Sequence, residues 1–218
     1  MALSANALTT VANLRDELGI TTGDNDTTLE RLINAASERF ASLCRREFAY
    51  SASVVERVKG GGTGLILVRR APIVSITSIK LSIGSSTTTY DATDYRIANA
   101  NAGLIERVNG CSPETADLVG VNFDPVASTQ RDLIEVTYAG GFVTPQQDAD
   151  DAELTRSLPY DIEEAVIVMA AQRYKSKGRD LAVTSRGTLR SKISYDHHQA
   201  NALPQLAREA VARYQWRH

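Results

Sequence analysis

The chain of 218 residues is 43% hydrophobic and has a formal net charge of -2, which predicts one globular unit, or one core with an appended module. Its two cysteines, Cys44 and Cys111, lack C-x-x-C spacing and give no disulfide framework, as expected in a reducing compartment. No signal-peptide pattern and no apolar run long enough to span a membrane occurs, so we expect a soluble protein without membrane contact.

The chain begins with two predicted helices. Thr10 is expected to cap the first, over Leu8–Ile20, because its hydroxyl can accept a bond from a backbone N–H of the first turn. Asp26–Phe48 has the strongest apolar periodicity of the chain and predicts a second, longer helix. Thr27 and Glu30 have the spacing of a capping box and are expected at its start.

After the second helix the sequence changes to short runs rich in Val, Ile, Thr and Tyr, which are typical of antiparallel strands joined by hairpins. We expect strands at Ser53–Val58, Leu65–Arg69, Ile73–Ile83, Thr87–Tyr90, Asp94–Ala98, Gly103–Val108 and Leu133–Tyr138. Ile76, Ile79 and Leu81 do not alternate cleanly, which predicts a bulge or a register change there. In Lys59–Gly64 the lysine precedes the glycines and a strand follows, so this run predicts a hairpin tip and not a phosphate loop.

An acidic stretch, Thr144–Ser157, follows the predicted strands. Its carboxylates resemble calcium ligands, but they lack the loop glycine and the closing glutamate of an EF-hand, so we interpret the stretch as an acidic surface turn. Pro159 then opens a second long helix, which ends before Gly178 and has Lys175 and Lys177 near its end.

The C-terminal region is basic. From Ala170 to His218 ten lysines and arginines stand against three acids, a net charge of +7. Such asymmetry is typical of a surface that binds an acidic protein or nucleic acid, or of a solvated helix face with a tail. Arg179–Asn201 predicts an extended arm or a small hairpin, and an amphipathic helix opens at Leu203 and Pro204. That helix either covers the core of its own chain or fills a groove of a partner.

No constellation of residues predicts catalysis, a cofactor or a metal. The residue types of an acyl-transfer site occur together at Ser194, Asp196, His197 and His198. Neighbours in an extended segment point to alternate faces, however, so they cannot form a chain of nucleophile, base and orienting group among themselves. A zinc site would need ligands from elsewhere, and Cys44 is expected to be buried. We therefore expect no enzyme activity.

Together these elements predict an α+β fold, with a helical-bundle body of about four helices and an inserted antiparallel β-module. A C-terminal arm and helix complete the chain. The expected parts are residues 1–48, the N-terminal helical hairpin; 49–143, the inserted β-module; 144–178, the acidic turn and the second long helix that completes the body; and 179–218, the extended basic arm and the C-terminal helix.

Several short sequence segments, called phrases below, follow one another in a characteristic order along the chain. They are Leu18–Ile20 and Cys44–Phe48 at the helix ends, Leu67–Ile76 and Ile134–Phe142 in the sheet, Leu158–Ala165 at the next helix, and Gly187–Tyr195 and Leu203–Leu206 in the tail. In this order the chain resembles the head-to-tail connector proteins (adaptor or head-completion proteins) of tailed bacteriophages. Each phrase alone is common in helices or strands, but their shared order extends over nearly the whole chain. The stretch Ser85–Thr129 is longer than expected for small members of that family.

The resemblance implies a structural virion protein, made in the host cytoplasm and located at the head-to-tail interface. Family members form a ring, commonly of twelve copies, that docks beneath the portal protein and extends the DNA channel toward the tail. The implied partners are the portal protein, other copies of the same chain, and a stopper or another neck or tail protein. DNA would pass through without sequence-specific binding, and no membrane is involved.

The resemblance also suggests candidate contact residues. In relatives the C-terminal segment reaches the portal, so the portal-contact candidates are Arg186, Arg190, Ile193, Tyr195, Leu203, Leu206, Val211, Tyr214 and Trp216. DNA must slide without sticking, and each basic contact to a phosphate adds affinity. We therefore expect an acidic lumen or rim, with Asp148, Asp150, Asp151 and Glu153 as candidates.

Two other functions remain open. One is a different neck or tail-completion protein, which would contact tail proteins instead of the portal. The other is a stand-alone β-module that binds a peptide or a glycan, which would need a concave aromatic site. The four Phe, eight Tyr and one Trp are spread along the chain and form no tight cluster in the sequence.

Overall fold

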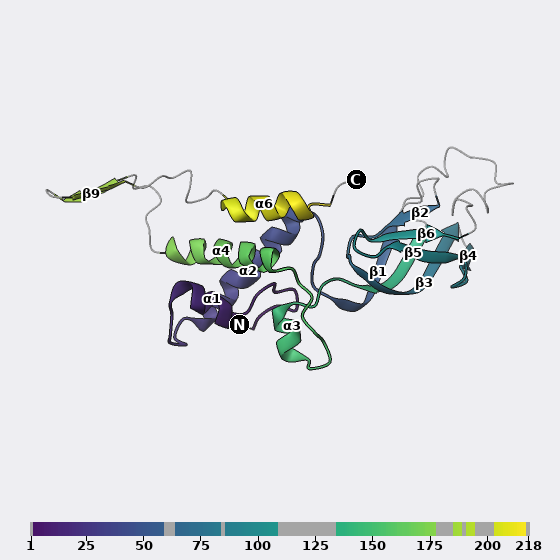
Figure 1. Ribbon diagram of the computed structural model, residues 1–218, viewed down its shortest axis with the longest axis horizontal. Helices are drawn as coiled ribbons and strands as arrows, with labels where there is room; N and C mark the ends of the chain where they lie inside the picture. Colours follow the sequence, from purple (N-terminus) through teal and green to yellow (C-terminus); the bar gives the residue numbers. More distant parts are fainter. Residues whose placement is uncertain are drawn as a thin grey trace. The chain divides into compact units, whose positions relative to one another are not determined.

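The structure, a computed structural model, describes residues 2–58, 64–83, 86–108, 134–177, 185–188, 191–194 and 203–216. By their contacts the residues divide into two compact units. The helical unit comprises Met1–Arg46 and Val143–His218, and the β unit comprises Glu47–Phe142. The described helices all belong to the helical unit, and the two larger antiparallel sheets belong to the β unit (Figure 1). The fold is therefore α+β, as the sequence predicts.

The helical unit is built on two long helices, α2 (Asp26–Cys44) and α4 (Tyr160–Lys175), which pack against each other. Two shorter helices, α1 (Val11–Leu18) and α6 (Gln205–Tyr214), each contact both of them, and α6 lies alongside α4 in Figure 1. All four helices contribute to the buried core, which includes Leu14, Leu29, Ile33, Phe40, Ile162, Val166 and Ala207. Burial of each large apolar side chain contributes about 1.5–3 kcal/mol.

Local sequence sets both ends of α1. Thr10 is the N-cap, as predicted, and its Oγ1 accepts a bond from the Asn13 N–H at 3.3 Å. Gly19 ends the helix in the left-handed conformation, with a φ of 66°. Glycine adopts this conformation at the least cost because it has no Cβ.

The start of α2 differs from the prediction. Thr27 and Glu30 do not form a capping box, because the helix already begins at Asp26 and its N-cap is Asn25, which makes no side-chain cap bond. Instead, the Asp26 carboxylate in the first turn accepts a bond from Arg15 of α1, with Nε and Oδ1 2.8 Å apart. A contact between two helices therefore takes the place of the predicted local motif.

The end of α2 also differs from the prediction, since the helix ends at Cys44 and not at Phe48. Arg45 takes the left-handed conformation, with a φ of 55°, which is uncommon for a residue with a Cβ. Its N–H bonds to the Ser42 carbonyl at 3.1 Å and closes the last turn. Phe48 consequently leaves the helix and belongs to the β unit.

The β unit holds two antiparallel sheets. The order in the four-stranded sheet is β1 (Ser51–Val58), β7 (Ile134–Gly140), β3 (Ile73–Ile83) and β4 (Ser86–Thr89). The order in the three-stranded sheet is β2 (Leu65–Leu67), β6 (Leu104–Arg107) and β5 (Tyr95–Asn99). The seven predicted strands are all present, with bounds that differ by no more than two residues.

Strand β3 is irregular where the sequence predicts it. Its register against β7 shifts between Ile73 and Ser75 and again between Ile76 and Ser78, which confirms the predicted bulge or register change. Residues of both sheets share one core, whose most buried members are Val68, Ile79, Leu81, Ile105, Ile134, Val136 and Tyr138.

The first and last segments of the β unit run side by side. The Phe142 N–H donates to the Phe48 carbonyl at 2.7 Å, and the Tyr50 N–H donates to the Phe142 carbonyl at 2.8 Å. Gly141 has a φ of 103°, and a Cβ at this position would lie 2.5 Å from the Ala49 carbonyl oxygen, so only glycine fits. The chain thus enters and leaves the β unit through one paired stalk.

Part of the acidic stretch is helical, whereas the sequence analysis predicts a turn. Helix α3 (Pro145–Asp150) begins with a capping box. Thr144 Oγ1 accepts from the Gln147 N–H at 3.2 Å, and Gln147 Oε1 accepts from the Thr144 N–H at 3.1 Å. Pro145 is also well suited to a first helical position. The capping box and this proline therefore favour a helix here despite the acidic composition.

The C-terminal arm contains a small hairpin, one of its two predicted forms. Strands β8 (Ser185–Thr188) and β9 (Ser191–Ser194) are antiparallel, with Arg186 opposite Ile193. The rest of the arm up to residue 202 lies outside the described residues, as does most of the predicted hairpin tip at residues 59–63.

Candidate functional site

Helix α6 covers the core of its own chain, which was one of the two alternatives for this helix. Ala207 and Ala210 are buried, and the helix contacts α4 and α2. Beyond its end, the Trp216 N–H donates to the Cys44 carbonyl at the end of α2, at 2.9 Å. Because alanine side chains form the buried side of α6, the helix approaches its neighbours through a small apolar surface.

Side chains near the end of α6 hold the helix to the start of α4. The Tyr214 hydroxyl donates to Asp161 Oδ1 at 3.0 Å, and Arg213 Nη1 donates to Asp161 Oδ2 at 2.7 Å. Burial, together with the bond to the Asp161 carboxylate, raises the pKa of Tyr214. Asp161 therefore serves as an acceptor that fixes the position of α6.

The predicted portal-contact residues fall into three groups by position. The first group belongs to the C-terminal segment 203–216, where Leu206 on α6 is 51% exposed and the partly buried members are Leu203, Val211, Tyr214 and Trp216. Arg186 and Ile193 lie opposite each other in the β8–β9 hairpin. Arg190 and Tyr195 lie outside the described residues. Among the described side chains of this set, Leu206 thus exposes a large apolar group.

The predicted acidic residues are all exposed, and they lie on α3 and the turn after it: Asp148, Asp150, Asp151 and Glu153. Two of them fix the local backbone. Asp148 Oδ1 accepts from the Arg156 N–H at 3.2 Å, and Asp151 Oδ1 accepts from the Glu153 N–H at 3.0 Å. Within the described ranges no group of three or more side chains is placed to hold a metal ion.

Sequence reasoning missed a buried carboxylate near the start of α4. Glu163 is only 5% exposed. Its Oε1 accepts bonds from Thr9 Oγ1 at 3.0 Å and from Asn13 Nδ2 at 2.6 Å, and its Oε2 lies 2.6 Å from Arg156 Nη2. A buried charge requires such partners because its desolvation is costly. The carboxylate therefore ties the N-terminal segment, α1 and the loop before α4 together.

An open depression adjoins this carboxylate, lined by Asn13, Arg156, Tyr160, Asp161, Glu163, Glu164 and Ile167. Tyr160 is 76% exposed, and the Arg156 guanidinium carbon lies 3.9 Å from the centre of its ring, as in a cation–π contact. Tyrosine and arginine are enriched at protein interfaces. The depression is accordingly a candidate contact surface.

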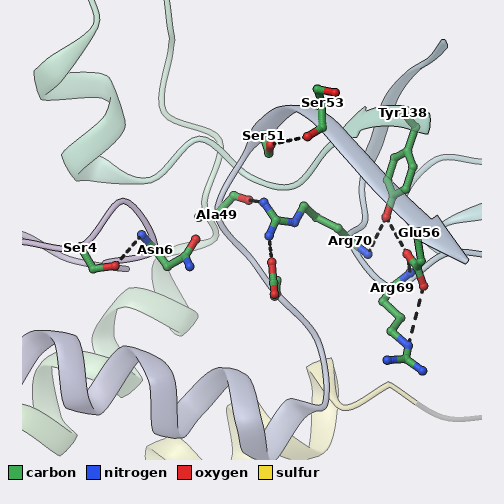
Figure 2. Close-up of polar contacts among 10 residues, drawn as sticks. Ser4, Asn6, Ala49, Ser51, Ser53, Glu56, Arg69, Arg70 and Tyr138 are labelled. Carbon is green, nitrogen blue, oxygen red and sulfur yellow. Dashed lines mark hydrogen bonds and ion pairs between the residues drawn. The ribbon is translucent and has the colours of Figure 1, made fainter. Parts of the chain in front are cut away.

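The β unit has a polar network around Tyr138 (Figure 2). The Tyr138 hydroxyl donates to Glu56 Oε2 at 2.9 Å and accepts from the Arg70 N–H at 3.1 Å. Glu56 Oε2 also accepts from the Arg69 N–H at 2.9 Å. Burial, followed by the nearby Glu56 charge, raises the pKa of Tyr138 well above its usual value. These bonds join two segments that carry the family resemblance, Leu67–Ile76 and Ile134–Phe142. The polar residues of those segments therefore stabilise the fold.

Arg70 extends this network toward the stalk. Its Nη1 donates to the Ala49 carbonyl at 3.2 Å (Figure 2), and its guanidinium also pairs with Glu47. Burial lowers the pKa of Arg70, yet an arginine remains charged at neutral pH. The contacts hold the first segment of the β unit against the loop before β3.

Of the residues considered for catalysis or zinc binding, Ser194 and Cys44 lie in the described part of the chain. Ser194 lies in β9, whereas residues 196–198 fall outside the described ranges, as does Cys111. Cys44 is buried, as predicted, and burial raises its pKa to about 12. Its thiol therefore stays protonated, and unreactive, at neutral pH.

A cavity in the β unit is lined by Tyr90, Tyr95 and Arg107 among other residues, and it has a volume of about 10 Å³. That is room for about one water molecule. A peptide or glycan would need a much larger hollow, so this cavity does not favour the stand-alone binding module. In the described residues, moreover, no helix is both long and apolar enough to cross a membrane.

Comparison with known proteins identifies the fold. No protein-family model and no curated protein matches the chain. It is similar to a chain in the neck of an empty gene transfer agent (GTA) particle computed with C6 symmetry, with a TM-score of 0.61 and 19% identity over 100% of this chain and 94% of that chain. A chain in the neck of a native GTA particle computed with C12 symmetry gives a TM-score of 0.57 and 17% identity, over 100% and 93%.

A chain in the virion of a native GTA particle gives a TM-score of 0.60 and 19% identity, over 100% of this chain and 94% of that chain. The similarity extends over the whole chain, and the described residues have the fold of chains in the neck and virion of GTA particles. This confirms, at the level of the fold, the resemblance to head-to-tail connector proteins.

Proposed function

We propose that this protein is a structural component of a virion neck. In this proposal it is a head-to-tail adaptor, which forms a ring beneath the portal protein and extends the DNA channel toward the tail. The observation that carries the proposal is the similarity to neck chains over all of this chain, which includes both units. A match to the helical unit alone would support only a common helical scaffold.

The ring itself is supported by the symmetry of those particles. Their necks were computed with C6 and C12 symmetry, and we propose twelve copies for this protein. A cyclic ring needs two different, complementary faces on each subunit. We infer that the helical unit, with its four packed helices, forms the body of the ring.

The C-terminal segment is our proposed portal-binding element. Ala207 and Ala210 hold α6 on its own core, so the portal would contact the outward side of α6, where Leu206 is exposed, together with the arm. Deletion of α6 would uncover the core between α2 and α4 and would test folding more than docking. A Leu206→Glu substitution leaves the buried side of α6 unchanged and is the better test.

The acidic group on α3 and its turn is our proposal for the channel lumen or rim. Its four carboxylates are exposed, which a surface that repels DNA phosphates requires. In this proposal the protein belongs to the virion at the head-to-tail interface and is made in the host cytoplasm. It has no catalytic role there, and DNA passes without sequence-specific contacts.

The proposal is tested by mixing the purified protein with the portal protein of the same virus and imaging the product by electron microscopy. We expect a closed ring stacked coaxially on the portal, and weaker docking of the Leu206→Glu variant. If both proteins are folded and no complex forms, the adaptor role is wrong. A tail-side neck or completion protein is then the next candidate, tested by the same imaging with tail proteins.

A further inference from the structure

The two ends of α4 carry opposite charge on the surface of the helical unit. The acidic end, residues 148–164, has five exposed acidic residues, Asp148, Asp150, Asp151, Glu153 and Glu164, and one partly buried basic residue, Arg156. It comprises the second half of α3, the turn after it and the start of α4. The basic end comprises the side chains Arg173, Lys175 and Lys177, all of which are exposed. The helical unit is thus polarised along α4.

The polarity extends beyond what the helix itself requires. Acids at a helix start and bases at its end favour the helix dipole, which accounts for Asp161, Lys175 and Lys177. It does not account for Asp151 or Glu153, which lie before α4. These two residues contribute charge to the acidic end without stabilising the helix.

The two ends cannot neutralise each other within one chain. Helix α4 has 16 residues, so its ends are about 24 Å apart. The basic end has a weak partner on its own chain, since Lys175 Nζ lies 3.9 Å from Glu17 and both side chains are largely exposed. An exposed pair at that distance contributes little. At the acidic end, Arg213 of α6 pairs with Asp161 and Arg156 pairs with the buried Glu163. The remaining exposed carboxylates, Asp148, Asp150, Asp151, Glu153 and Glu164, carry the charge that another molecule can bind.

The acidic end also has the shape and chemistry to receive basic side chains. Its depression places the exposed ring of Tyr160 beside the carboxylate of Glu164, whereas the neighbouring Asp161 is already bound by Arg213 and Tyr214. An aromatic face and a carboxylate each attract a lysine or arginine head group. Arg156 already occupies one position of this kind, at 3.9 Å from the Tyr160 ring centre.

We propose that the acidic end of one copy binds the basic end of a second copy, so that neighbouring subunits associate head to tail. This inference deepens the proposed ring and rests on it. The occupant is a second copy because the complementary charge lies on the same chain, and because a cyclic ring joins two different faces of each subunit. Charge complementarity of this kind sets the register and excludes like-charged contacts.

The acidic group on α3 joins the two proposals. The Asp148 carboxylate binds the Arg156 N–H, and the Arg156 side chain contacts both Glu163 and Tyr160. The candidate rim residues and the depression are therefore parts of one acidic surface. In the ring, this surface would run from the channel rim into the contact between subunits.

The test exchanges the charges. One variant carries Asp151→Lys and Glu164→Lys, a second carries Lys175→Glu and Lys177→Glu, and a third carries all four substitutions. The matched control, Arg31→Glu with Arg39→Glu, reverses two exposed positions of α2. Ring formation on the portal is measured by electron microscopy and native mass spectrometry, at several salt concentrations, after circular dichroism has shown that each variant folds.

We expect each double variant to weaken ring formation by about tenfold or more. The variant with all four substitutions should form rings again, and the control should form them like the unmodified protein. Unmodified rings should also weaken as salt is raised. The inference is overturned if either double variant forms rings like the unmodified protein, or if the variant with all four substitutions fails to form them. It is also overturned if salt does not change ring formation by the unmodified protein. A protein that never docks on the portal would instead overturn the proposed function. If a variant does not fold, the salt dependence of the unmodified protein decides.

Discussion

Removal of the buried charge at Glu163 offers a direct test of how the helical unit is held together. A Glu163→Gln substitution keeps the size of the side chain but removes its charge. Oε1 accepts two bonds from Thr9 and Asn13, and Oε2 pairs with Arg156 at 2.6 Å. An amide replaces one of these acceptor atoms with a donor, so at least one partner loses its bond.

We expect Glu163→Gln to lower the free energy of unfolding by about 2–3 kcal/mol, less than the full cost of breaking a buried pair, because Arg156 is partly exposed. With a urea m-value of about 2 kcal/mol/M, the midpoint would fall by about 1–1.5 M. Far-UV circular dichroism follows the helical unit during the titration.

Glu164→Gln is the matched control, because the neighbouring residue is exposed and its substitution should change stability by less than about 0.5 kcal/mol. If both variants unfold at the midpoint of the unmodified protein, the contacts of Glu163 contribute nothing to stability and the reasoning is wrong. A Thr9→Val substitution should show a smaller loss, since it removes one bond to the same carboxylate.

Three further predictions concern other parts of the molecule. Tyr138→Phe should destabilise the β unit by about 1–2 kcal/mol, because Glu56 and the Arg70 N–H lose a partner; an unchanged urea midpoint would contradict this. The pKa of Tyr138 is raised in the folded protein, so its contribution to the free energy of unfolding is fully present below about pH 10, where the unfolded tyrosine ionises, and decreases as the pH rises further. Urea titrations from pH 8 to 11 measure this decrease, which should be smaller in the Tyr138→Phe variant. Cys44, with its pKa raised to about 12, should be alkylated slowly in a Cys111→Ser protein until urea unfolds it; rapid alkylation of the folded protein would disprove its burial.

Local motifs explain why part of this fold was predictable. Thr10 caps α1 as predicted because its acceptor and the Asn13 N–H are three residues apart. The same spacing failed at Thr27, because the helix begins one residue earlier, at Asp26, whose carboxylate binds Arg15. The start of α3 was predictable in principle from Thr144 and Gln147, but the acidic composition obscured it.

The candidate contact surfaces were less predictable, because their partners are distant in sequence. In the sequence alone, nothing distinguishes Glu163 from an exposed acidic residue such as its neighbour Glu164. Only the fold brings Thr9 and Asn13 to it, across more than a hundred residues, and no periodicity encodes such a contact. The exposure of Tyr160 was equally hard to predict, since tyrosine is intermediate between the mostly buried and the mostly exposed residue types.

The paired stalk of the β unit has a consequence for how such a chain can change. Its first and last segments are hydrogen-bonded neighbours at Phe48 and Phe142, so the two points where the chain enters and leaves the β unit are already close together. A short turn could therefore replace the whole β unit, or a larger one could be exchanged for it, while the helices stay joined. The helical unit and the β unit would then be free to evolve separately.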